Sequence, residues 1–84
     1  MARVEFVVEE AGCASCAQRV REALAPLGVV EEVVIDEQAD EAAVALAAGD
    51  DVTEAAVADA LARASEGAGH AYRVRAGSWT AARA

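Results

Sequence analysis

The hydrophobic pattern of this chain switches repeatedly between the period of a strand and the period of a helix, and this order of switches constrains the fold most. Side chains alternate between two faces over residues 3–9, 41–47 and 71–75, which is typical of half-buried strands, and residues 29–36 are a further strand candidate. Between these segments, apolar residues of 15–27 and 53–64 recur at helical spacing. The predicted order is therefore strand, helix, strand, strand, helix, strand.

One side of each predicted strand is apolar, so one face of the sheet should be covered and the other should meet water. The strand residues that we expect to face the core are Val4, Phe6, Val8, Val29, Val33, Ile35, Ala42, Val44, Leu46, Tyr72 and Val74. The helical residues expected to cover them are Cys16 or Ala17, followed by Val20, Leu24, Leu27, Val57, Leu61 and Ala64. These patterns predict an α+β fold: an open-faced βαββαβ sandwich with a four-stranded antiparallel sheet and both helices on one face.

Polar and small residues predict where the elements end. Ser15 is the expected N-cap of the first helix, and Pro26 should end that helix near Ala25. Thr53 is the expected N-cap of the second helix, with Asp51 as the competing candidate. We expect residues 1–76 to form one domain. The remaining tail, residues 77–84, has no period, so we expect it to be frayed, with Trp79 as a lightly packed anchor rather than a recognition residue.

Charge excludes several classes of partner. Fifteen Asp and Glu residues against seven Arg and no Lys give a formal net charge of −8. Nucleic-acid binding needs a cationic face, and anionic membranes attract cationic segments, so neither partner is expected. No apolar run approaches the roughly 20 residues that span a bilayer, and the N-terminus does not resemble a signal peptide. These features predict a cytoplasmic protein without membrane insertion, whose partner is a metal cation or a basic protein.

The chemistry of the chain is concentrated in Cys13 and Cys16, its only two cysteines. A disulfide between residues so close together constrains little, so the pair is unlike a structural cross-link. The pair lies where the first strand passes into the first helix, and the positive end of the helix dipole favours a thiolate at Cys16. Thiolates are soft ligands that prefer copper(I), zinc and heavier metals. Two ligands are too few for a closed tetrahedral zinc site, so we expect an open site suited to delivery.

Two alternative roles for the cysteine pair fit the sequence less well. The same spacing marks thiol–disulfide oxidoreductases, but here Ala14 and Ser15 separate the cysteines and Pro26 is the only proline, so no later proline can line a dithiol site. The cysteines could instead be small buried hydrophobic residues. Burial of two thiols is not expected in a loop that contains Gly12.

The segment Ala11–Leu24 resembles the metal-binding segment of heavy-metal-associated domains. These are the ferredoxin-like metallochaperones and the N-terminal domains of copper-exporting P-type ATPases. The resemblance continues through Val33-Val34-Ile35 and Gly69-His70 and spans nearly residues 3–75. It implies that Cys13 and Cys16 bind the metal, usually copper(I), and release it by ligand exchange with a partner domain of the same fold.

The chain departs from the family pattern at two positions. Ala11 stands where the family usually has methionine under the metal loop, and Gly12 stands where threonine is common. We therefore expect a looser loop, with more effect on metal preference than on binding itself.

His70 is the only histidine and lies in the loop between the second helix and the last strand. In this fold that loop is expected near the cysteines. His70 is then either a third, switchable ligand or a surface residue beside the metal, and the sequence supports both roles equally. Arg19, Arg21 and Arg63 form either a small cationic docking patch or ordinary solvated helix positions.

Together these features predict a cytoplasmic copper(I) carrier that is not an enzyme, with Cys13, Cys16 and His70 as the candidate metal site. Zinc, cadmium and mercury(II) would also bind two thiolates. The expected partner is a metal-transporting P-type ATPase or another metal-binding domain, and the expected state is a monomer or a metal-bridged dimer. Because the chain begins with Met1 and contains no membrane segment, it resembles the free-standing carriers. The alternatives are a thiol–disulfide oxidoreductase and a regulatory module of the same fold that senses a small molecule.

Overall fold

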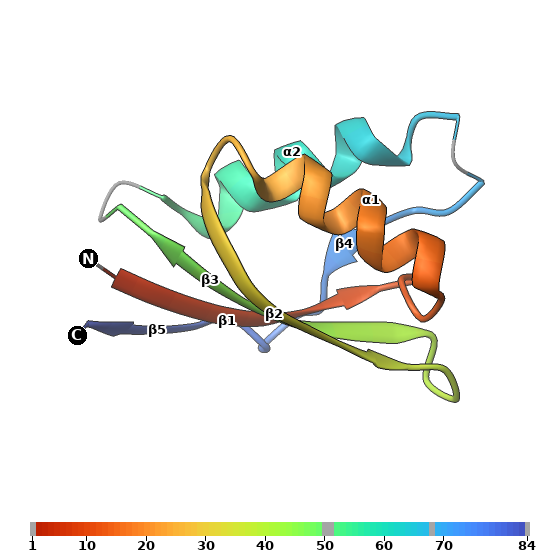
Figure 1. Cartoon of the computed structure of the whole chain (residues 1–84), viewed down its shortest axis with the longest axis horizontal. Coiled ribbons are helices and arrows are strands. Elements are labelled where there is room, and N and C mark those ends of the chain that lie inside the picture. Colours follow the sequence, from red (N-terminus) through yellow and green to blue (C-terminus); the bar gives the residue numbers. More distant parts are fainter. Residues whose placement is uncertain (1, 50–51, 68, 84) are drawn as a thin grey trace.

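The protein is an antiparallel sheet with two helices packed on one of its faces (Figure 1). The computed structural model describes residues 2–49, 52–67 and 69–83. Its elements are β1 (Ala2–Glu9), α1 (Ala14–Leu24), β2 (Gly28–Asp36), β3 (Glu41–Ala48), α2 (Glu54–Ser65), β4 (Arg73–Val74) and β5 (Thr80–Arg83). The strands lie in the order β2-β3-β1-β4, with β5 also paired to β1. The predicted α+β class and βαββαβ order are confirmed.

The core lies between the helices and the central strands. β1 and β3 pair in a register that places Val4 opposite Leu46, Phe6 opposite Val44 and Val8 opposite Ala42, and all six side chains are buried. Residues four positions apart on each helix cover them, because such residues lie on the same helical face. These fully buried helical residues are Val20 and Leu24 on α1 and Val57 and Leu61 on α2.

The prediction of which β2 side chains face the core is wrong for the first half of this strand. Val29 is 64% exposed, and its neighbour Val30 is the half-buried residue. The register with β3 shifts between Val30 and Glu32, so Glu31 is an extra residue in the strand. A bulge of this kind reverses the alternation of the side chains, and therefore the simple two-residue pattern holds only beyond it, at Val33 and Ile35.

The expectation of a frayed C-terminal tail is also wrong. Thr80–Arg83 form β5, which pairs with residues 2–5 of β1, whereas β4 pairs only with Val8 and Glu9. The segment between β4 and β5 satisfies the backbone of Val7: Arg75 N donates to Val7 O (2.8 Å) and Val7 N donates to Ser78 Oγ (3.0 Å). Trp79 stacks on buried Phe6 with ring centroids 5.3 Å apart. The tail is ordered because β5 pairs with the free edge of β1 and because Trp79 contacts Phe6.

The helix ends follow the sequence closely except at the start of α1, where Cys13 is the cap. Thr53 caps α2 as predicted, since its Oγ1 accepts a hydrogen bond from Ala56 N (3.1 Å). α1 ends at Leu24, one residue before the expected Ala25. The longest helix, α2, has 12 residues, and no described helix is long and apolar enough to cross a membrane.

Candidate metal centre

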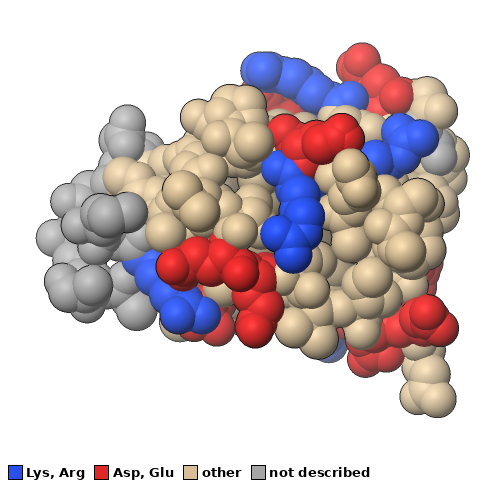
Figure 2. All heavy atoms as spheres, viewed as in Figure 1, with Lys and Arg blue, Asp and Glu red and all other residues tan. Residues whose placement is uncertain are grey.

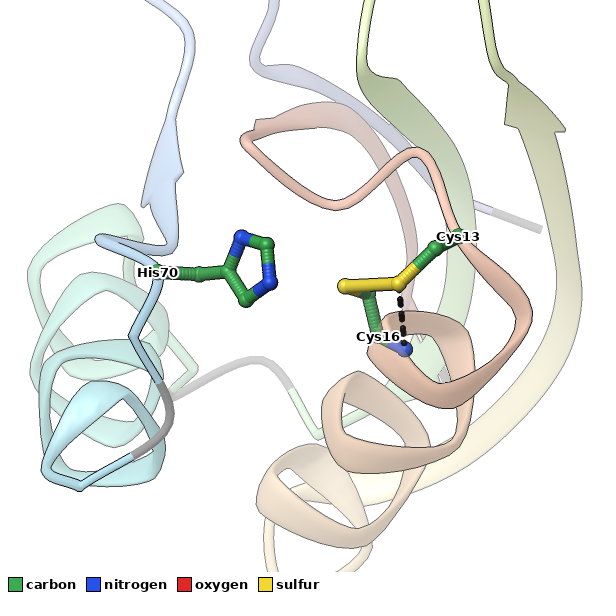
Figure 3. Close-up of side chains that lie close together, drawn as sticks. All are labelled: Cys13, Cys16 and His70. Atoms are coloured by element: carbon green, nitrogen blue, oxygen red, sulfur yellow. Dashed lines mark hydrogen bonds between the residues drawn. A yellow bond between two sulfur atoms is a disulfide. The ribbon is translucent and has the colours of Figure 1, made fainter.

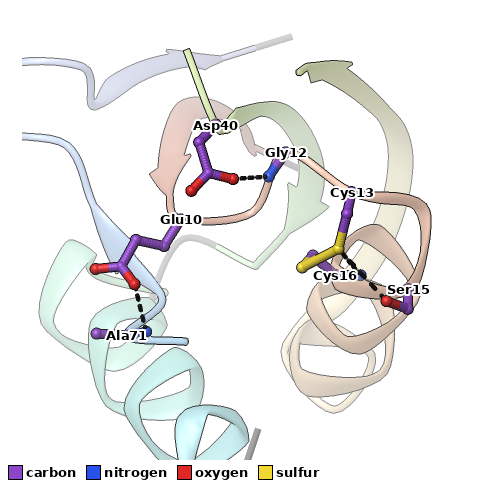
Figure 4. The surroundings of a disulfide bond; sticks show 7 residues. All are labelled: Glu10, Gly12, Cys13, Ser15, Cys16, Asp40 and Ala71. Atoms are coloured by element: carbon purple, nitrogen blue, oxygen red, sulfur yellow. Dashed lines mark hydrogen bonds between the residues drawn. A yellow bond between two sulfur atoms is a disulfide. The ribbon is translucent and has the colours of Figure 1, made fainter. Parts of the chain in front are cut away.

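The loop from β1 to α1 is held against the β2–β3 turn. Ala11 N donates to Asp40 O (3.1 Å), and Gly12 N donates to Asp40 Oδ1 (3.1 Å; Figure 4). A side chain at Gly12 would place its Cβ 2.6 Å from Asp40 Cα. Gly12 is therefore required by this close backbone approach. Ala11, in the position where methionine is usual in the family, is fully buried.

Cys13 begins α1 as its N-cap. It has extended dihedrals (φ −124°, ψ 160°), and its Sγ accepts a hydrogen bond from Cys16 N at 3.3 Å. The prediction that Ser15 is the cap is wrong, because Ser15 already lies inside the first helical turn. Its Oγ instead lies 3.4 Å from Cys13 Sγ. The capping contact directs the Cys13 sulfur toward the start of the helix, where Cys16 also lies.

The two cysteines are joined as a disulfide in this structure, with their Cα atoms 5.1 Å apart (Figure 3). This structure thus shows the pair in its oxidised form, whereas the predicted binding of metal by thiolates needs the reduced form. The expectation that both thiols escape burial is right only for Cys13, which is half-buried, because Cys16 is 1% exposed and packs in the core. Cys16 occupies the core-facing stripe of α1 with Val20 and Leu24, and this explains its burial.

The His70 ring faces the sulfur pair from the loop that follows α2, whereas both cysteines lie at the start of α1 (Figure 3). The donor atoms of Cys13, Cys16 and His70 all lie within 4.8 Å of one another. The loop turns at Gly69 (φ +77°), and the His70 imidazole stacks on the Tyr72 ring with centroids 5.8 Å apart and planes 10° apart. The three ligand candidates predicted from the sequence therefore lie together at one end of the sheet.

Comparison with known proteins identifies the family. The model of the heavy-metal-associated domain matches residues 5–70. The chain belongs to the heavy-metal-associated domain family. The predicted family resemblance is thus confirmed, and a search of curated protein sequences found no match.

Two solved structures resemble this heavy-metal-associated domain. A chain from work on "Crosstalk between Cu(I) and Zn(II) homeostasis" has 25% identity and a TM-score of 0.54, with 84% of this chain and 97% of that chain covered. Oxidized MerP from Ralstonia metallidurans CH34 has 17% identity and a TM-score of 0.56, with 87% of this chain and 97% of that chain covered. Both likenesses support the ferredoxin-like fold.

Three polar residues of this heavy-metal-associated domain support the site and were not predicted from the sequence. Asp40 accepts the hydrogen bond from Gly12 N, and Glu10 Oε1 accepts a hydrogen bond from Ala71 N (3.1 Å; Figure 4). Ser65 Oγ accepts from Tyr72 N at 2.8 Å. The Glu10 and Asp40 contacts join residues 61 and 28 positions apart, so no local sequence pattern could indicate them.

The helices of the domain show mixed charge. Arg63 donates to Asp59 Oδ2 at 2.6 Å. Both residues line a groove between α1 and α2, and Arg19 lines it from α1. On the face shown in Figure 2, arginines lie beside carboxylates and form no separate cationic region. The pairing of exposed Arg63 with Asp59 favours the interpretation of Arg63 as a solvated helix position.

Proposed function

We propose that this heavy-metal-associated domain is a soft-metal carrier that binds copper(I) through Cys13 and Cys16. The observation that supports it is the convergence of two sulfurs and one imidazole within 4.8 Å at a strand-to-helix turn. Thiolates and imidazole suit copper(I), and the N-terminal end of α1 favours negative charge on the sulfurs. Zinc, cadmium and mercury(II) are the competing cargoes, because the same donors accept them.

Loading requires the disulfide to be reduced first. A dithiol reductant would transfer two electrons and two protons, becoming a disulfide itself and leaving thiols at Cys13 and Cys16. Copper(I) then replaces the two thiol protons, which pass to solvent. A partner's thiolate would add to the metal before one of these sulfurs leaves. Cys13 is half-buried whereas Cys16 is 1% exposed, so Cys13 is the sulfur that a docking partner reaches more readily. No substrate bond is made or broken, and the proposed activity is not enzymatic.

The proposed partner is a second metal-binding domain, either free or attached to a metal-transporting P-type ATPase. A similar solved chain at 25% identity comes from work on copper(I) and zinc(II) homeostasis, which supports a role in handling these metals. The thiolate form needs a reducing compartment, and the cytoplasm supplies one. The carrier is proposed to act as a monomer or as a metal-bridged dimer.

An anaerobic competition titration tests the metal assignment. We expect the reduced protein to bind one copper(I) per chain and to retain it in the presence of excess zinc, because two soft thiolates form a closed zinc site less readily than a low-coordinate copper(I) site. The measurement is the amount of each metal bound at equilibrium against a copper(I)-specific competitor. Equal or better retention of zinc would exclude copper(I) as the preferred cargo.

Replacement of His70 by Ala tests whether the imidazole contributes. We expect His70→Ala to keep one copper(I) per chain and to accelerate its transfer to a competitor by about tenfold, as expected for loss of a weak or supporting ligand. Stopped-flow transfer to a coloured copper(I) chelator would measure the rate. An unchanged affinity and transfer rate would make His70 a bystander.

A second candidate function is thiol–disulfide exchange, which the proximity of Cys13 and Cys16, close enough to pair as a disulfide, supports. The discriminating measurement is insulin reduction by the rigorously metal-free protein. Activity above that of a free dithiol would support the oxidoreductase. Activity equal to the free dithiol, together with copper(I) retention, would support the carrier.

A further inference from the structure

The placement of His70 depends on how the loop between α2 and β4 is held. It turns through Gly67 (φ +75°) and Gly69 (φ +77°), and a Cβ placed on either glycine would meet no atom within 4 Å. Among the described residues of this loop, the side-chain contacts that position it lie at His70 and on its C-terminal side, where the His70 ring also stacks on Tyr72. Two backbone amides are bonded there: Tyr72 N donates to Ser65 Oγ (2.8 Å), and Ala71 N donates to Glu10 Oε1 (3.1 Å).

The Glu10 contact differs from the Ser65 contact in what it connects. Ser65 is the last residue of α2, so its hydrogen bond holds the loop to its own helix. Glu10 follows the last residue of β1 and lies three positions before Cys13, in the strand-to-helix loop. Its hydrogen bond joins the two loops that supply the candidate ligands, across 61 positions of sequence. Figure 4 shows the Glu10 side chain extending toward Ala71, away from the Asp40–Gly12 contact.

We propose that Glu10 is a positioning residue that sets His70 at the sulfur pair. The Ala71 amide is part of the planar peptide group that joins His70 to Ala71. A hydrogen bond at this amide therefore restrains the backbone of His70 directly. The other carboxylate oxygen, Oε2, lies 3.8 Å from Arg73 Nη2 and forms an exposed ion pair with it. The consequence for metal release rests on the proposed function, whereas the restraint on the loop is independent of any metal.

Three variants separate the hydrogen bond from the charge. Glu10→Ala removes both, and Glu10→Gln keeps an oxygen that accepts from Ala71 N without the charge. Arg73→Gln removes the ion pair and leaves the Glu10 hydrogen bond. Glu10 has a φ of 60°, and both of its substitutions keep a Cβ there, so the backbone strain is matched between them. Glu9→Ala removes the neighbouring carboxylate and serves as a charge control.

The first measurement uses the reduced, metal-free protein. We expect Glu10→Ala to increase hydrogen exchange at the Ala71 amide by about threefold to tenfold, the range for loss of one exposed, charge-assisted hydrogen bond. Nuclear Overhauser contacts between the His70 ring and the β-protons of Cys13 and Cys16 should weaken in parallel. Glu10→Gln, Arg73→Gln and Glu9→Ala should retain both signals. Unchanged exchange and unchanged ring contacts in Glu10→Ala would overturn the proposal.

The second measurement is copper(I) transfer to a chelator from the loaded proteins. We expect Glu10→Ala to accelerate transfer as much as His70→Ala does, and the double variant to add nothing further, because both changes remove the same interaction. Additive effects, or a normal rate in Glu10→Ala beside a fast rate in His70→Ala, would overturn the positioning role. If the wild-type protein fails to retain copper(I), the proposed function fails, and the metal-free measurement still decides the role of Glu10.

Discussion

Copper(I) retention is expected to disappear when Cys13 is replaced by Ser and Cys16 by Ala, with the fold preserved. Each replacement is chosen from the local structure. Ser is a good N-cap, so Cys13→Ser keeps an acceptor for Cys16 N. Ala at position 16 avoids a hydroxyl at a site that is 1% exposed. Anaerobic equilibrium dialysis against a copper(I) competitor would measure bound metal, and circular dichroism would check the fold.

Ser15→Ala is the matched control for this experiment. It alters the same loop, since Ser15 Oγ lies 3.4 Å from Cys13 Sγ, but it leaves both sulfurs in place. We expect it to retain copper(I). Full copper(I) retention by the variant without cysteines would contradict the proposed site. Full biological function of that variant would instead favour the regulatory module that senses a small molecule.

Leu24→Ala is expected to destabilise the protein by about 3 kcal/mol, because a fully buried leucine is replaced by a smaller side chain that leaves a cavity. A domain of this length has only about 4–13 kcal/mol of total stability, so the loss is large. The melting temperature should fall by about 15 °C. Urea unfolding of the reduced protein, followed by circular dichroism, would give the free energy of unfolding.

Leu27→Ala is the matched control for Leu24→Ala. It makes the same chemical change three positions along the chain, just beyond α1, but Leu27 is only half-buried. We expect a loss of about 1 kcal/mol there. Equal losses in the two variants would contradict the assignment of Leu24 to the centre of the core.

Hydrophobic periodicity was sufficient to predict the order of the six elements from β1 to β4, because each helix and each long strand turns one apolar face toward the core. The pattern failed where tertiary contacts intervened. The extra residue Glu31 in β2 exposes Val29 and turns Val30 inward. The sequence Val29-Val30-Glu31-Glu32 offers two adjacent valines and does not by itself say which of them faces the core. The C-terminal segment has too little alternation to predict β5, whose order depends on the free edge of β1 and on the Phe6–Trp79 contact.

The candidate site was predictable to a similar extent. Cys13 and Cys16 are identifiable from their spacing and from the change of period at that point, and His70 from its place in the predicted topology. Their oxidation as a disulfide was not predicted. The burial of Cys16 could have been inferred from its spacing with Val20 and Leu24, but the glycine-containing loop suggested otherwise.

Local patterns of this sequence determine that the chain is an α+β domain with a sulfur pair at a strand-to-helix turn. A strand or helix face is defined by residues within a few positions of one another, so the chain order contains that information. Only the tertiary structure shows that Glu10 bonds the loop of His70 and that Asp40 bonds the loop of Cys13. These hydrogen bonds connect residues far apart in sequence, and their partners are chosen by how the finished sheet and helices bring the loops together.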